Sequence, residues 1–222
     1  YDANDEAEIT SLYQSSAGIK GQEDTRLLLP TSSWQNYTNG QSIQVKMLEL
    51  VSAEAIIDAK ASTYSDGQLL KSAGMAFFKI SVENLPAQLK ECVEVQIPAP
   101  EIEGMRPYLT PGNGDIRRAN WKELPTEQMR YDAQAQAYVV KVCDSDELSA
   151  MNGSFGVNID KPVSEADEPP LLVRVKNRKG SHPIPTIVHE DGTVTNLRQV
   201  APEAGLANTF KRQYYLFPNT TD

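Results

Sequence analysis

Apolar and polar positions alternate in many short segments of the chain, and this pattern predicts a protein built mainly from β-strands. In residues 43–50 the apolar Ile43, Val45 and Met47 are separated by polar residues. A strand with this pattern buries one face and exposes the other to water. Similar runs follow, each bounded by the Gly, Pro, Asn or Asp residues that are typical of turns. We expect further strands at 27–30, 69–70, 75–82, 92–97, 138–143, 171–175, 185–189, 193–197 and 214–218.

Helical periodicity is nearly absent, so we expect a low α-helix content. Only residues 52–60 are rich in helix-forming residues. Gly74 predicts a β-bulge or a close approach of another backbone, because no second glycine follows at the spacing that cradles a phosphate. Short strands need a second sheet to cover their apolar faces, which favours a β-sandwich.

Composition divides the chain into three parts. Residues 1–24 are acidic and polar, and we expect them to form a flexible N-terminal arm. Residues 25–165 contain most of the predicted strands and are expected to form the β-sandwich domain. An acidic, proline-rich stretch ends this domain, and residues 166–222 are expected to form a second, smaller β region.

Charge and hydropathy exclude two classes of partner. The net charge of −9 repels phosphate backbones, and no basic patch with interleaved aromatic residues is present, so we expect no nucleic-acid binding. The apolar runs are far shorter than the roughly 18 residues of a transmembrane helix, so we expect no transmembrane segment. The chain begins at Tyr1 without an apolar leader. Membrane anchoring would therefore depend on an N-terminal segment that processing removes or that lies outside this sequence.

A series of short motifs accompanies the predicted strands in a characteristic order. They are Leu28-Leu29-Pro30, Asn39-Gly40, Glu49-Leu50, Ser72-Ala73-Gly74-Met75, Met105-Arg106-Pro107-Tyr108, Trp121 and Asn158-Ile159-Asp160. In this order they resemble a group of Bacteroidetes surface lipoproteins of unknown function whose N-terminal domain is similar to the ZU5 β-sandwich. The resemblance covers about residues 26–175. It implies a ZU5-like or immunoglobulin-like β-sandwich, export and a tethered N-terminus at the cell surface, and it implies no activity.

The two cysteines, Cys92 and Cys143, lie far apart in the sequence, and neither belongs to a CxxC or CxH motif. This spacing argues against a metal site or a thioredoxin-like redox centre. Each cysteine lies in an alternating run, and both face inward if the valines two positions away do. A disulfide bond and a pair of buried free thiols are both open interpretations.

Catalytic constellations are not evident. The only histidines are His182 and His189, and a triad with Ser181 and Asp191 would need a convergence in space that proximity in sequence does not supply. The acidic loop 144–147 lacks the glycine and the final glutamate of an EF-hand. We therefore predict no catalytic residue, no metal and no cofactor, in a protein that is not an enzyme.

Aromatic residues and edge strands are the remaining candidate binding features. Trp34, Tyr37 and Trp121 are candidates for stacking on sugars, and core packing is the alternative for each. An aromatic strand near the C-terminus is a candidate for pairing with the sheet edge of a neighbouring molecule, and the alternative is that it completes its own sheet. Its aromatic side chains are Tyr214, Tyr215 and Phe217.

Taken together, these features predict a non-enzymatic structural or protein-interaction module that is secreted or located at the cell surface. Its expected partner is another surface protein or a copy of itself. The alternative is a carbohydrate-binding surface protein that uses exposed aromatic side chains.

Overall fold

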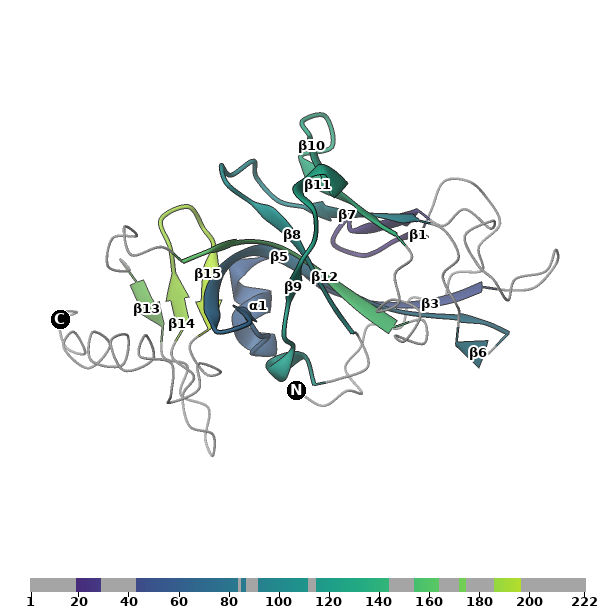
Figure 1. The fold of residues 1–222 in the computed structure, drawn as a ribbon, viewed down its shortest axis with the longest axis horizontal. Helices are drawn as coiled ribbons and strands as arrows, with labels where there is room; N and C mark the ends of the chain where they lie inside the picture. Colours follow the sequence, from purple (N-terminus) through teal and green to yellow (C-terminus); the bar gives the residue numbers. More distant parts are fainter. Residues whose placement is uncertain are drawn as a thin grey trace.

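Antiparallel β-strands make up most of the regular structure in the computed structural model of the chain (Figure 1). The structure describes residues 19–28, 43–83, 85–86, 92–111, 115–143, 154–163, 172–174 and 186–196. Within these residues the strands form two sheets, and the helical structure is limited to one α-helix and two short 3₁₀ helices. The prediction of a mostly β protein with little α-helix is confirmed.

The smaller sheet contains five strands in the order β1-β2-β7-β11-β10, and all neighbouring strands are antiparallel. Its longest ladder joins β7 to β11, from Val93 opposite Val142 to Pro98 opposite Ala137. The strands are β1 (Ile19–Lys20), β2 (Arg26–Leu28), β7 (Val93–Pro98), β10 (Met129–Asp132) and β11 (Ala137–Val142).

The larger sheet contains ten strands and is organised around one long central strand, β5. Ala76 of β5 lies opposite Glu49 of β3 and also opposite Val157 of β12, so β3 and β12 flank β5 on its two edges. The strands are β3 (Ile43–Leu50), β4 (Tyr64–Ser65), β5 (Gln68–Val82), β6 (Leu85–Pro86), β8 (Arg106–Pro111), β9 (Lys122–Glu123), β12 (Ser154–Pro162), β13 (Leu172–Arg174), β14 (Thr186–Val188) and β15 (Val194–Asn196).

A β-bulge interrupts the ladder between β5 and β12. Gly74 lies opposite Ile159 and Ser72 lies opposite Asp160, so Ala73 is an extra residue on β5. A Cβ atom at Gly74 would lie 3.2 Å from Ile97 Cγ2 and 3.6 Å from the Cα of Val51. The sequence-based prediction of a bulge or a close approach at Gly74 is confirmed, but residues 68–82 form one continuous strand rather than two.

The two sheets pack face to face through an apolar core. Ile43, Val45 and Met47 of β3 are all buried in it, as their alternation predicted. The rings of Phe78 and Phe155 pack in the same core with centroids 5.2 Å apart. Burying one large aliphatic or aromatic side chain contributes about 1.5–3 kcal/mol. This core therefore supplies much of the free energy that holds the two sheets together.

A carboxylate at the end of β3 also connects the two sheets. Glu49 accepts hydrogen bonds from the backbone N–H groups of Gln22, Glu23 and Thr25 in the β1–β2 turn, at 2.7, 3.1 and 3.1 Å. A Cβ atom at Gly21 would overlap this carboxylate, so a larger residue there would require the Glu49 side chain to move. Hydrogen bonds to a charged acceptor are stronger than neutral ones, and the turn is therefore fixed to the larger sheet.

The opposite face of the larger sheet is covered by α1 (Ala53–Ala59), by the 3₁₀ helix η3 (Ile116–Arg118) and by the segment that follows it. The second 3₁₀ helix, η4, spans Thr126–Gln128. The α-helix begins at Ser52, whose side chain accepts a hydrogen bond from Ala55 N at 3.1 Å, and it ends at Lys60 in the left-handed conformation. Ile56 and Ala59 face the sheet and are buried. Part of β5 therefore lies between two covered faces (Figure 1).

The structure places the end of the predicted N-terminal arm in a sheet. Ile19 and Lys20, which we assigned to the N-terminal arm, form β1. At the other end, Val194 of β15 lies opposite Ser72 of β5, and Val194 is buried in the same core as Leu70. The predicted division of the chain at residue 165 stays a prediction, although β15 and β5 belong to one sheet.

Candidate functional site

Cys92 and Cys143 form a disulfide bond, and the described residues include no free cysteine. The two cysteines lie directly beyond one end of the β7–β11 ladder, where Cys92 precedes Val93 and Cys143 follows the opposite residue Val142. The disulfide therefore joins adjacent antiparallel strands of the smaller sheet. Both cysteines are partly buried, and of the two interpretations the structure supports the disulfide.

Trp121 belongs to the core. Its side chain is 0 % exposed, and its ring packs against Phe77 with the centroids 5.5 Å apart. Its indole N–H donates a hydrogen bond to the carbonyl oxygen of Ser62 at 2.8 Å. A ring with no exposed face cannot stack on a sugar, so the sugar-binding interpretation of Trp121 is wrong and the core-packing alternative is correct.

Several predicted site residues lie outside the described residues. This applies to the predicted sugar-binding residues Trp34 and Tyr37, and to His182 and the acidic loop 144–147. It also applies to the predicted edge-pairing residues, so the roles assigned to all of these residues stay predictions. Those edge-pairing residues are Tyr214, Tyr215 and Phe217.

Three buried polar side chains meet on the α1 side of the larger sheet, next to the bulge. The Ser72 hydroxyl donates a hydrogen bond to Asn158 Oδ1 at 2.7 Å, and Asn158 Nδ2 donates to Asp160 Oδ2 at 2.7 Å. Asp160 Oδ1 accepts a further bond from the backbone N–H of Lys161 at 2.8 Å. The exposed fractions of Ser72, Asn158 and Asp160 are 1, 0 and 0 %. We call these three residues the amide–acid cluster.

The electrostatics of the amide–acid cluster favour a neutral Asp160. Burial raises the pKa of the Asp160 carboxyl well above its usual range, and the hydrogen bonds from Lys161 N and Asn158 offset this only in part. A buried carboxylic acid that keeps its proton acts as a hydrogen-bond donor or a proton donor. This group is therefore the strongest candidate for chemistry in the described residues.

A second polar group adjoins the cluster on the neighbouring strand β8. Tyr108 lies opposite Asn158, and its hydroxyl donates to Glu123 Oε2 at 3.3 Å. Glu123 also accepts two bonds from the Arg106 guanidinium, at 3.0 and 3.2 Å. Burial, followed by the negative charge of Glu123, raises the pKa of Tyr108. Tyr108 therefore keeps its proton at neutral pH.

The β14–β15 hairpin is attached next to the cluster by specific polar contacts. Thr195 Oγ1 donates to the carbonyl oxygen of Leu70 at 2.7 Å. The Asn196 side chain donates to the carbonyl oxygen of Ala61 at 2.6 Å, and its backbone N–H donates to Thr63 Oγ1 at 2.8 Å. These buried bonds fix the position of the hairpin relative to β5.

The turn of the same hairpin contains two residues of the triad that we considered from the sequence. His189 Nε2 lies 2.9 Å from Thr195 Oγ1. Asp191 accepts bonds from the backbone N–H and hydroxyl of Thr193, and it pairs with Lys161 Nζ at 3.0 Å. These contacts account for Asp191 as a turn residue and lend no support to a catalytic role for it.

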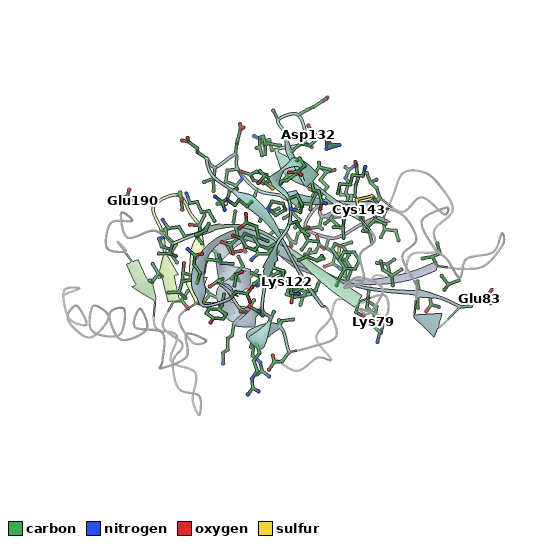
Figure 2. The ribbon with its side chains drawn as sticks, viewed as in Figure 1. Lys79, Glu83, Lys122, Asp132, Cys143 and Glu190 are labelled. Carbon is green, nitrogen blue, oxygen red and sulfur yellow. A yellow bond between two sulfur atoms is a disulfide. The ribbon has the colours of Figure 1, made fainter. Side chains whose placement is uncertain are left out.

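Open sheet edges are the other candidate for function. Among the described residues, β3 pairs only with β5, so no described strand lies along the other edge of this eight-residue strand. Figure 1 shows β3 and the end of β5 extending together away from the rest of the fold. In Figure 2, Glu83 lies at the tip of this extension and Lys79 lies closer to the body. The other strands with one described neighbour, such as β1 and β10, are shorter.

The amide–acid cluster was missed by sequence reasoning because polar residues inside a strand normally face water. Asn158 and Asp160 alternate with the apolar Val157 and Ile159, which is the pattern of a half-exposed strand. The signal that the sequence offers is the motif Asn158-Ile159-Asp160, in which two polar residues flank one apolar residue.

The described residues contain no candidate metal site and no candidate membrane-spanning helix. In the described ranges, no group of three or more His, Cys, Asp or Glu side chains is arranged to hold a metal ion. No helix in the same part of the chain is long and apolar enough to cross a membrane. Comparison with protein-family models, with curated proteins and with solved structures finds no match.

Proposed function

We propose that this chain is a non-enzymatic structural or protein-interaction module of the cell surface, which binds another surface protein or a copy of itself through the open edge of β3. The observation that carries the proposal is the eight-residue length of β3, which has β5 as its one partner among the described strands. An edge strand presents unpaired N–H and C=O groups, and an added strand pairs with them through main-chain hydrogen bonds.

The location of the chain is part of the same proposal. The disulfide between Cys92 and Cys143 supports an oxidising compartment, because cytosolic thiols are kept reduced. The two packed sheets are consistent with the resemblance to surface proteins that have a ZU5-like or immunoglobulin-like sandwich. We infer a secreted or surface-anchored protein from these two observations.

The strand that binds β3 is proposed to be the C-terminal aromatic segment of a second copy, which contains Tyr214, Tyr215 and Phe217. The first experiment is light scattering on the full chain across a concentration series. We expect a mass that rises above the 24.5 kDa of the monomer as concentration increases. A chain truncated after Gly205 is expected to remain folded by circular dichroism and to remain a monomer. An unfolded truncation would show instead that the segment belongs to the core of its own chain.

The role of β3 is tested by a pair of matched substitutions. Gln44→Lys adds a charge to the edge strand β3, and charged side chains on an edge oppose pairing. Gln96→Lys adds the same charge to β7, which is paired with β2 on one side and β11 on the other. We expect the first variant to weaken association and the second to leave it unchanged. Equal effects of the two variants on association would show that the binding partner does not pair with β3.

Carbohydrate binding is the alternative function, and it now depends on Trp34 and Tyr37 alone. A sugar-binding protein would lose affinity in the Trp34→Ala or Tyr37→Ala variants and keep its fold. An assembly module would show no binding to sugars at millimolar concentration.

A further inference from the structure

The amide–acid cluster contains the three groups that an intramolecular acyl transfer requires. Ser72 supplies a hydroxyl nucleophile, Asn158 supplies a carboxamide carbon, and Asp160 supplies a buried acid next to the amide nitrogen. We propose that Ser72 and Asn158 form an ester cross-link between β5 and β12, with Asp160 as the catalytic acid. This inference does not depend on the proposed binding role of β3.

The reacting atoms already lie close together. Ser72 Oγ is 2.7 Å from Asn158 Oδ1. A carbonyl C=O bond is about 1.23 Å long, so Oγ is within about 4 Å of the Asn158 Cγ atom that it attacks. Reactive arrangements place the two atoms about 3–3.5 Å apart. The Ser72 hydroxyl is hydrogen-bonded to Oδ1 in the structure, so attack requires a side-chain rotation that brings Oγ over the face of the amide group.

The reaction balances with ammonia as its one leaving product. Ser72 Oγ attacks Asn158 Cγ, and the Oγ proton passes to Oδ1 along the hydrogen bond that joins them. Asp160 Oδ2 accepts a hydrogen bond from Nδ2 at 2.7 Å before the reaction. Once the tetrahedral intermediate gives Nδ2 a free lone pair, Asp160 protonates this nitrogen and the Cγ–Nδ2 bond breaks to release ammonia. The Oδ1 proton returns to the Asp160 carboxylate as the ester carbonyl forms. Asp160 ends in its initial state, and no oxidant or reductant is required.

The surroundings of the cluster suit this chemistry. The three side chains are almost completely removed from solvent, and their neighbours on the same face include the buried apolar residues Leu70 and Met75. Exclusion of water keeps a proton on Asp160 and protects the ester from hydrolysis once it has formed. The raised pKa of Asp160 has the sign that a proton donor at neutral pH needs.

The cross-link would close a large loop of the chain. Ser72 and Asn158 are 86 residues apart in the sequence, and the disulfide between Cys92 and Cys143 lies within this interval. The two bonds would then fix one central strand pair in each sheet.

The test is a mass measurement on the full chain. After reduction of the disulfide, we expect the intact mass to be lower than the sequence mass by one ammonia. Trypsin does not cleave before proline, so Lys161-Pro162 stays intact and Asn158 lies in the peptide 142–174. The Ser72 peptide is 72–79. In the reduced digest we expect these two peptides to remain joined.

Variants assign the bond to its residues. Ser72→Ala is expected to restore the full sequence mass and to separate the two peptides. Ser62→Ala is the matched control, because Ser62 is also a buried serine but lies outside the cluster; it is expected to keep the ammonia loss. Asp160→Asn is expected to abolish or strongly slow the cross-link. Circular dichroism on each variant confirms that the protein is folded.

Two results would overturn the proposal. One is a reduced wild-type chain with the full sequence mass and separate peptides, which would leave the cluster as a hydrogen-bonded network only. The other is an ammonia loss that persists in a folded Ser72→Ala variant, which would place the reaction elsewhere, such as at Asn39-Gly40.

Discussion

The two faces of the larger sheet use the same strands in opposite ways. Toward the smaller sheet, β5 and β12 present Phe78, Ile80 and Val157 to a core that consists of apolar side chains. Toward α1, the same strands present Asn158 and Asp160 as well as apolar side chains. Alternation of apolar and polar residues along a strand therefore does not always mean that the polar residues are exposed to solvent.

The two faces of the larger sheet also contribute different kinds of free energy to the fold. Apolar burial is non-directional and scales with area, so the face between the sheets supplies stability. A buried polar network is favourable only when each member has a partner, so the face toward α1 supplies specificity and a setting for chemistry. Substitutions on the two faces should therefore differ in size and in pH dependence.

The largest effect is expected from the face between the sheets. Phe78→Ala removes a ring that is 2 % exposed and packs against Phe155. Truncation of a buried phenylalanine costs about 3–5 kcal/mol in the free energy of unfolding. Urea denaturation followed by circular dichroism measures this loss. A loss below about 1 kcal/mol would contradict the description of this face as the main source of stability.

The disulfide at the end of the β7–β11 ladder is expected to rank next. Its two cysteines are 51 residues apart, and a disulfide typically contributes about 2–4 kcal/mol by restricting the unfolded chain. The double variant Cys92→Ser, Cys143→Ser should lose this amount. A reducing agent should cause a similar loss in the wild type and none in the variant. A wild type that is insensitive to reduction would show that the bond contributes little.

The Glu49 contact to the β1–β2 turn should have an intermediate effect. Glu49→Ala leaves the three N–H groups without their acceptor, and hydrogen bonds to charged groups are worth about 1.5–3 kcal/mol. The matched variant Glu49→Gln keeps an acceptor oxygen and should lose less. Denaturation curves of the two variants give the comparison, and equal losses would show that the charge is unimportant.

Asp160 should make stability fall as pH rises. Its folded pKa lies above the unfolded value, so above about pH 4 the unfolded chain releases a proton that the folded chain retains. The stability advantage of wild type over Asp160→Asn should therefore shrink between pH 4 and pH 7. An advantage that grows over this range would mean that Asp160 is ionised in the folded protein.

Asp191 should show a smaller effect of opposite sign. Partial burial alone would raise its pKa, but hydrogen bonds from Thr193 and the contact with Lys161 lower it to about 2. The stabilisation is present above about pH 4 and is lost as pH falls toward 2. Because the group is partly exposed, Asp191→Asn should cost only about 0.5–1 kcal/mol at pH 7. The free energies of unfolding of the wild type and Asp191→Asn should converge as pH falls to about 2, which urea denaturation at several pH values measures. A difference that stays constant with pH would contradict a lowered pKa for Asp191.

Strands with a clean apolar alternation could be predicted from the sequence. Residues 43–50 and 138–143 were placed within one residue of the observed β3 and β11. The hairpin around Asp191-Gly192 was also predicted, because the turn residues lie between two β-branched runs. Local pattern decides these elements, so the sequence is sufficient for them.

Other elements depend on contacts between distant parts of the chain. The strand β12 was not predicted, and the burial of its polar Asn158 and Asp160 depends on β5 and β8, which pair with it on its two sides. The burial of Trp121 depends in the same way on Phe77 and Ser62. The amide–acid cluster joins β5 to β12, and no local pattern contains both.

The central functional claim is that the chain binds a second copy through the edge of β3. Amide hydrogen exchange of residues 43–50, measured on dilute and concentrated samples of the full chain, tests it most directly. We predict slower exchange at the outer edge of β3 in the concentrated sample and no change in residues 93–98 of β7. Unchanged exchange in β3 at every concentration, with a mass that stays at 24.5 kDa, would contradict the claim.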